Sequence, residues 1–106
     1  MKDRLYEILT TINGFYHNVD DVVHQYVSLI NEAIEIIRSI EAPSTSMLDE
    51  AKNKAITELC NELASRLNDS FFHSSPERRK NEFKISKMLV GIAIGNVISK
   101  LPDESE

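Results

Sequence analysis

The chain is poor in the residues that cross-link small proteins or end their helices. Its 106 residues include one cysteine, three glycines and three prolines, and they include no tryptophan. The lone Cys60 excludes an intrachain disulfide and fits a reducing compartment, so we expect a cytoplasmic protein. Few glycines and prolines leave few positions that would interrupt a helix. We therefore expect long helices joined by few loops.

Long hydrophobic runs are also missing. The longest, Met88 to Ile98, covers eleven residues and contains two glycines and Asn96. A helix needs about 20 predominantly apolar residues to cross a bilayer, so we expect no contact with membranes. The first residues alternate charged and apolar side chains, which is not the charged-then-apolar order of a secretion signal.

Positive charge is scarce. The chain has 12 Lys or Arg against 17 Asp or Glu, a net charge of −5. Sequence-independent binding to nucleic acid needs many basic side chains on phosphates, so the overall balance argues against it. The acidic excess lies in residues 1–53, which carry four basic and nine acidic side chains, whereas residues 54–106 carry eight of each. The apolar share of 42% is that of an ordinary globular protein, and the length fits one domain.

What the sequence does contain is a seven-residue apolar repeat from Leu5 to Ile40. With Leu5 at position a, every a, d and e position is apolar or aromatic. The a positions are Leu5, Ile12, Val19, Tyr26, Ala33 and Ile40. The d and e positions are Ile8, Leu9, Phe15, Tyr16, Val22, Val23, Leu29, Ile30, Ile36 and Ile37. This pattern predicts an amphipathic helix with a broad apolar face, of the kind that packs as a coiled coil.

Asn13-Gly14 normally indicates a turn, but here the repeat passes through it without a change of phase. We therefore predict one continuous helix over residues 2–41. Its stripe alone would run roughly 54 Å at about 1.5 Å per residue, whereas a compact domain of this size is about 30 Å across. Such a rod implies an elongated bundle, a partner chain, or both.

Helix-breaking and helix-capping residues predict two further helices. Pro43 breaks the first helix, and the serines and threonine after it can cap a second helix over residues 46–70. Ser74-Ser75-Pro76-Glu77 resembles a Ser-x-x-Glu capping box and opens a third helix over residues 76–101. Residues 102–106 form an acidic tail. The predicted fold is all-α: a single domain over residues 1–101, built as an elongated antiparallel three-helix bundle with a long N-terminal helix.

The third helix indicates a homodimer. Its residues 88–98 are apolar almost all the way round, and such a helix is expected to be buried on every side. The spacing Gly91-x-x-x-Gly95 lets two helix backbones approach closely. We therefore predict a dimer interface on this helix, formed by Gly91, Ile94, Gly95 and Ile98. The alternative is close packing of the third helix against the first within one chain.

One group of side chains has metal-ligand chemistry. His17, Asp21 and His24 are spaced i, i+4, i+7, with Asp20 beside them, and imidazole with carboxylate suits zinc or iron. These residues lie opposite the apolar stripe, however, and a solvated polar face explains them better than a metal site does. They are weak candidates for a metal-dependent helical enzyme, and we assign no catalytic residue, cofactor or metal.

The remaining candidates favour binding to another protein. Adjacent Phe71 and Phe72 cannot both point inward from one helix, so one is left for a partner. We predict a small cytoplasmic adaptor or regulator, of inhibitor, immunity or antitoxin type. The predicted partner-binding residues are Asp20, Asp21, Phe72, Arg78 and Arg79. The alternative is a nucleic-acid-associated regulator that reads phosphates through the basic start of the third helix, at Arg78, Arg79, Lys80, Lys84 and Lys87.

Overall fold

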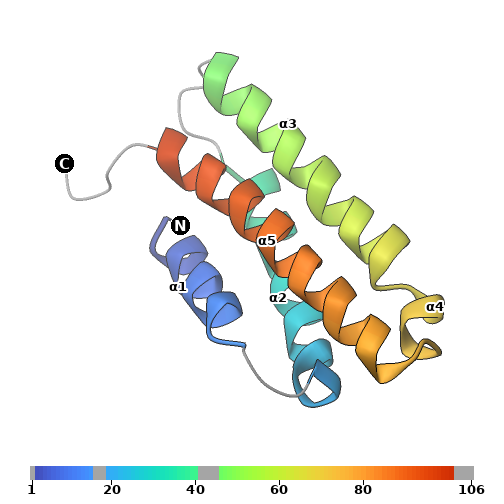
Figure 1. Cartoon of the computed structure of the whole chain (residues 1–106). Helices are drawn as coiled ribbons and strands as arrows, with labels where there is room; N and C mark the ends of the chain where they lie inside the picture. The colour runs from blue at the N-terminus through green and yellow to red at the C-terminus, as the bar shows by residue number, and fades with distance from the viewer. Residues whose placement is uncertain (1, 16–18, 41–45, 102–106) are drawn as a thin grey trace.

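The computed structural model describes residues 2–15, 19–40 and 46–101, and every regular element within them is helical (Figure 1). The all-α prediction is therefore confirmed, but the elements number more than three. They are α1 (Lys2–Asn13), α2 (Val19–Arg38), α3 (Ser46–Asn61), the π-helical segment η1 (Glu62–Arg66), α4 (Asp69–Phe72) and α5 (Pro76–Lys100).

The four long helices form an up-and-down bundle in which α5 lies between α1 and α3, with α2 behind it (Figure 1). Contacts at both ends fix the direction of α1 against α5. Lys2 Nζ donates to the Leu101 carbonyl at 3.4 Å, and Lys87 donates to the Phe15 carbonyl, so α1 and α5 are antiparallel. Tyr26 of α2 meets Ser86 of α5 across the core. The Cα atoms extend over 46 × 23 × 17 Å, which is an elongated bundle.

The prediction of one helix over residues 2–41 is wrong. Helix α1 ends at Asn13, where the Gly14 N–H shares the Thr10 and Thr11 carbonyls at 3.1 Å each, and α2 begins at Val19. Both arms bury their stripe in the same core: Ile8 and Ile12 from α1, and Ile30 among others from α2. Two packed arms remove both stripes from water within one chain, which a single rod cannot do. Each helix has an apolar face of the same kind, so the repeat alone does not reveal the break between them.

The predicted helix over residues 46–70 is also divided. After α3 the chain widens into the π-helical turn η1, where the Leu67 N–H bonds to the Glu62 carbonyl at 2.8 Å, five residues back. Asn68 then caps α4 by accepting from the Ser70 N–H at 2.9 Å. Turns of this π type are uncommon and often mark places where a side chain has a special position.

Helix α5 begins at Pro76 as predicted, but its cap is one residue later than the predicted capping box. The Ser75 hydroxyl accepts from the Arg78 N–H at 3.2 Å. The third residue after this cap is therefore Arg78, which cannot accept a hydrogen bond in return. Proline fits the first turn because its missing N–H would have no helical partner there.

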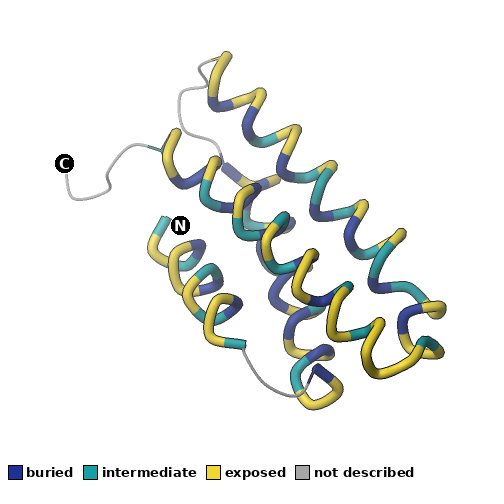
Figure 2. The backbone as a smooth tube through the Cα atoms, viewed as in Figure 1, coloured by how far each residue is buried: buried dark blue, intermediate teal, exposed yellow. Residues whose placement is uncertain are grey.

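Within the single chain, residues 88–98 are not buried on every side. Helix α5 turns one face into the core, through Phe83, Ser86, Val90, Ala93, Ile94, Val97 and Ile98. Met88 and Ile92 stay exposed on the opposite face, where Figure 2 shows a line of exposed positions along α5. No helix in the described ranges has both the length and the apolar character that crossing a bilayer requires.

Candidate functional site on helix α5

Three large apolar side chains form a row along the outer face of α5. Ile85 is 40% exposed, Met88 58% and Ile92 65%. Their i, i+3, i+7 spacing places them one above another on the same side of the helix. Single exposed apolar residues are ordinary, but several of them in a row on one helix form an exposed apolar surface, which is typical of interaction sites. We call these three residues the α5 row.

A groove lies beside the α5 row, in the crevice between α3 and α5. It consists of two adjoining hollows of about 200 and 140 Å³ that share Lys54 and Asn96. Three of the eleven lining residues are alanines, and their short side chains leave space open. The lining residues of the two hollows are Met47, Glu50, Ala51, Lys54, Ala55, Glu58, Leu89, Ile92, Ala93, Asn96 and Lys100. Because Ile92 belongs to both features, the row and the groove form one continuous surface.

The charge of α5 is opposite to that of the rest of the chain. It carries six basic and two acidic side chains, a net of +4. Since the whole chain has a net charge of −5, the remaining residues carry −9. Lys84 and Lys100 are both exposed, and the i+4 spacing continues from Lys84 through Met88 and Ile92 to Lys100. Lys84 therefore lies beside one end of the α5 row, and Lys100 lies about two turns beyond the other end.

The residues predicted for a dimer interface do not belong to the α5 row. Ile94 and Ile98 are in the core of the single chain, at 0% and 4% exposure. A Cβ atom built on Gly91 would lie 3.7 Å from Leu9 Cδ1, so Gly91 packs against α1 within the chain. A Cβ atom on Gly95 would meet nothing within 4 Å. Because Ile94 and Ile98 are buried within one chain, the geometry gives no support to a dimer interface formed by all four residues.

Replacing Gly95 with alanine is expected to raise the free energy of unfolding by about 1 kcal/mol. The space around the position is open, and alanine favours a helix interior over glycine by roughly that amount. Urea denaturation of the two proteins measures the change. Gly91→Ala is the matched comparison and should gain at least as much, since its new methyl group would lie 3.7 Å from Leu9 Cδ1, an ordinary van der Waals contact. A loss of stability or a fall in molar mass in Gly95→Ala would instead show that Gly95 lies in a contact between two chains.

Two of the predicted partner-binding residues bind each other. Arg79 donates to both carboxylate oxygens of Asp20, at 2.9 and 3.1 Å, and also to the Ser74 carbonyl. These bonds tie the start of α5 to the start of α2. Asp21 and Arg78 are exposed. Arg79 therefore stabilises the contact between α5 and α2, which weakens its assignment to a partner surface.

Phe72 is the exposed member of the Phe71-Phe72 pair. Phe71 is buried, whereas Phe72 is 43% exposed and stacks on His24 with ring centroids 6.1 Å apart. The two phenylalanine rings meet edge to face at 5.4 Å. This small aromatic surface at the α4 end of the bundle is the main alternative to the α5 row as an apolar binding site.

The metal and nucleic-acid candidates receive little support from the geometry. His17 lies outside the described residues, and within the described ranges no group of three His, Cys, Asp or Glu side chains could hold a metal ion. In the basic cluster, Lys87 donates to the Phe15 carbonyl and lies 5.1 Å from the centroid of the Phe83 ring. Arg79 is held by Asp20. This leaves Arg78, Lys80 and Lys84 exposed from the set proposed to read phosphates.

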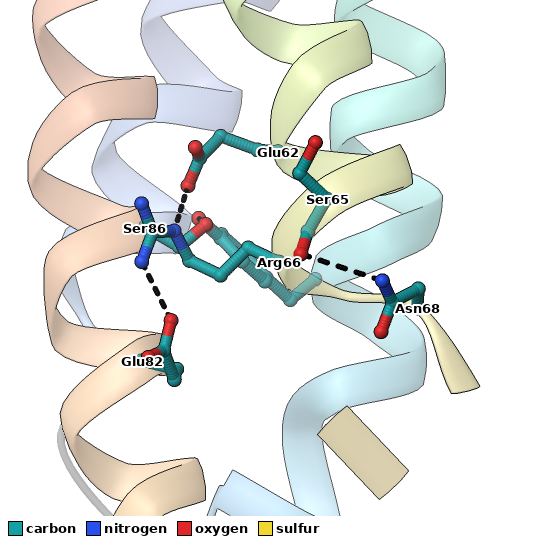
Figure 3. A network of polar contacts seen from close by, with 7 residues as sticks. Glu62, Ser65, Arg66, Asn68, Glu82 and Ser86 are labelled. Atoms are coloured by element: carbon teal, nitrogen blue, oxygen red, sulfur yellow. Dashed lines mark hydrogen bonds and ion pairs between the residues drawn. The ribbon is translucent and has the colours of Figure 1, made fainter. Parts of the chain in front are cut away.

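Sequence reasoning missed a polar network inside the bundle (Figure 3). Glu62 of η1 is 5% exposed and accepts from Arg66 Nε at 2.7 Å, and Arg66 also donates to Glu82 of α5 at 2.6 Å. Beside this pair, the hydroxyls of Tyr26 and Ser86 lie 2.8 Å apart, both fully buried. The signal in the sequence was Tyr26 at an a position, since a buried tyrosine hydroxyl needs a polar partner.

The pKa values of two groups in this network, the Tyr26 phenol and the Arg66 guanidinium, are shifted. Burial raises the pKa of the Tyr26 phenol above its ordinary value near 10, and the Ser86 hydrogen bond offsets part of that rise. Burial works to lower the pKa of Arg66, but the hydrogen bonds to Glu62 and Glu82 outweigh it and raise the pKa. The phenol therefore stays neutral and the guanidinium stays charged at ordinary pH.

Comparison of the chain with known protein families, curated proteins and solved structures finds no match. The choice of a site therefore depends on geometry. Within the described residues, every buried side-chain nitrogen or oxygen has a hydrogen-bond partner, so the internal network is closed and holds the fold. The α5 row and the groove present unfilled apolar surface to the outside, and they form the candidate functional site.

Proposed function

We propose that this chain works by binding another protein, and that the α5 row and the adjoining groove are its binding surface. The observation that supports this is the line of Ile85, Met88 and Ile92, exposed at i, i+3, i+7 beside a hollow lined by apolar side chains. Side chains at this spacing are the usual anchors when one helix packs on another. An inhibitor, immunity or antitoxin role is one form of such binding.

The surface resembles the core of a protein interface in chemistry. Met and aliphatic side chains occupy its centre, and charged residues, Lys54 and Glu58 of α3 among them, form its border. Burial of apolar centres surrounded by a polar rim is the common arrangement in stable complexes. The sequence-predicted partner residues Asp20 and Arg79 hold the bundle together instead, and Phe72 marks the alternative surface.

Site-specific photo-crosslinking in the cells that make the protein tests this proposal. A photoreactive phenylalanine analogue is placed at position 92, at position 72 and at the exposed Glu35 of α2. We expect a discrete covalent adduct from position 92 and none from the Glu35 control. Adducts from position 72 with none from position 92 would move the binding surface to α4. The absence of adducts from both apolar positions would overturn the proposal.

Self-association is a separate prediction with a direct measurement. Light scattering after size-exclusion chromatography gives the molar mass over a wide concentration range. A dimer would show twice the 12.1 kDa mass of the single chain. Since Ile94 and Ile98 are buried in one chain, a dimer interface on α5 would use the α5 row in their place. A constant value equal to the mass of one chain would leave the α5 row free for a different protein.

A further inference from the structure

Helix α1 packs on elements that come later in the chain. Its apolar stripe lies in the core, and Arg4 forms an ion pair with Glu32 of α2. At the same end of α1, Lys2 donates to the Leu101 carbonyl at 3.4 Å. None of these contacts depends on which copy of the chain supplies α1. The surface that α1 covers on α2 and α5 therefore fits the α1 of a second copy as well as it fits its own.

Helices α1 and α2 lie side by side and run in opposite directions. Arg4, near the start of α1, meets Glu32 in the second half of α2. Phe15, just after α1, meets Tyr26 in the first half of α2, with ring centroids 6.4 Å apart. If the chain between them were straight, α1 would continue the line of α2 beyond the end of its own bundle. It would then lie where a neighbouring copy could receive it.

The described backbone at the end of α1 departs little from a helix. The Gly14 N–H bonds to the Thr10 carbonyl, its i−4 partner in an α-helix, and also to the Thr11 carbonyl. No non-glycine residue and no glycine in the described ranges has a positive φ, so Gly14 does not use the backbone conformation that only glycine adopts easily. This part of the junction therefore needs little change to continue α1 as a helix.

The apolar repeat also passes through the junction in helical register, with Phe15 at position d, Tyr16 at e and Val19 at a. A turn does not require this register, whereas one continuous helix does, because its apolar side chains must share a face. A helix from Lys2 to Arg38 would be roughly 55 Å long at about 1.5 Å per residue. In one chain such a helix would leave the α1 stripe in water. Two antiparallel copies would cover each other's stripes.

We infer that two copies of the chain exchange α1. In the dimer, α1 and α2 of each copy form one helix, and α1 of one copy packs against α2 and α5 of the other. The exchange needs no new contact chemistry, because the Arg4–Glu32 pair and the core contacts of α1 form again between copies. The α5 row takes no part in it, so the inference goes beyond the proposed function and does not rest on it.

Cross-linking between two different variants tests the exchange. Both carry Cys60→Ala; one adds Arg4→Cys and the other Glu32→Cys, at side chains that are 40% and 39% exposed. The two proteins are mixed in urea, refolded together at high concentration and treated with a short bis-maleimide. We expect a covalent pair of the two different chains on a denaturing gel, identified by mass spectrometry. Arg4→Cys mixed with Glu50→Cys, at an exposed position of α3, is the matched control and should give no such pair.

Variants at the junction should shift the exchange in opposite directions. Gly14→Ala should raise the dimerisation constant about ten-fold or more, because alanine favours a helix interior over glycine in both copies. Its Cβ atom would lie 3.4 Å from the Thr11 carbonyl oxygen, so the folded-back chain accommodates it too. Insertion of Gly-Ser-Gly after Gly14 lengthens the connection and takes the repeat out of phase, and it should abolish the dimer. Light scattering measures both effects, and circular dichroism checks that both variants keep their helices.

Three results would overturn the inference. They are a constant single-chain mass after refolding over the whole concentration range, a dimer without the covalent pair between positions 4 and 32, and a dimer that survives the insertion. Adducts between another protein and position 92 are expected whether or not α1 is exchanged, so the proposed function is tested separately.

Discussion

Replacing Arg66 with methionine is expected to lower the free energy of unfolding by about 3 kcal/mol, at the lower end of the range for breaking a buried ion pair. The loss arises because Glu62, whose side chain is 6% exposed, would keep a buried carboxylate with no cation beside it. Arg66 itself is 23% exposed, which places the effect at the lower end. Urea denaturation at neutral pH measures it, and the melting temperature should fall by on the order of 15 °C.

A second arginine–glutamate pair provides the control. Arg4 of α1 binds Glu32 of α2, and both side chains are about 40% exposed. Water and salt weaken exposed pairs, so Arg4→Met should change stability far less than Arg66→Met. Glu62→Gln added to Arg66→Met should recover part of the loss, because the buried group then carries no charge. Equal losses in the two arginine variants would contradict the role assigned to burial.

Removing the Ser86 hydroxyl is expected to cost about 2 kcal/mol, and removing the Tyr26 hydroxyl about 1 kcal/mol, although the two groups share one hydrogen bond. The asymmetry has a physical cause. In Tyr26→Phe the Ser86 hydroxyl can turn to a carbonyl of its own helix, as helical serines do. In Ser86→Ala the phenol hydroxyl stays buried, and no other described side chain contacts it through a hydrogen bond.

The double variant completes a double-mutant cycle for Tyr26 and Ser86. Tyr26→Phe with Ser86→Ala leaves no hydroxyl unsatisfied, so its stability should match that of Tyr26→Phe alone and exceed that of Ser86→Ala. Denaturant titrations of the four proteins give the coupling energy. Additive losses would show that the two hydroxyls do not depend on each other.

Tyr26 also predicts a loss of stability in alkali. Burial raises the pKa of its phenol in the folded chain, whereas the unfolded chain ionises near the ordinary value of 10. The contribution of the raised pKa is therefore complete below pH 10 and is lost as the pH rises above it, at about 1.4 kcal/mol per pH unit. Tyr26→Phe removes this component. Between pH 9.5 and 11.5 the stability of the variant should fall less steeply than that of the native chain.

The part of the fold that the sequence predicted is the part that depends on residue type and spacing. Helical character, the start of α5 at Pro76 and the faces of Leu5, Ile8 and Ile12 follow from propensity and apolar period. The interruption after Asn13 did not follow. A repeat specifies which face of a helix is buried. It does not specify whether the residues that carry it form one long helix or two antiparallel helices.

The candidate site could be predicted in part. The sequence indicated that residues 88–98 carry more apolar surface than a surface helix needs, and it placed an interface there. It could not assign individual side chains, because an almost wholly apolar segment has no polar side to show which direction faces outward. Packing against α1, α2 and α3 put Ile94 in the core and left Ile92 exposed.

The sequence by itself determined an all-helical chain with an acidic first half and a last helix that is basic at its start and apolar at its end. These properties are local, since each depends on neighbours within a few turns. Only the tertiary structure decided the fold-back of α1 on α2, the partners of Tyr26 and Arg66, and the exposure of the α5 row. Each of these depends on which helices lie side by side, and burial of apolar surface between distant segments of the chain is the main force behind that choice.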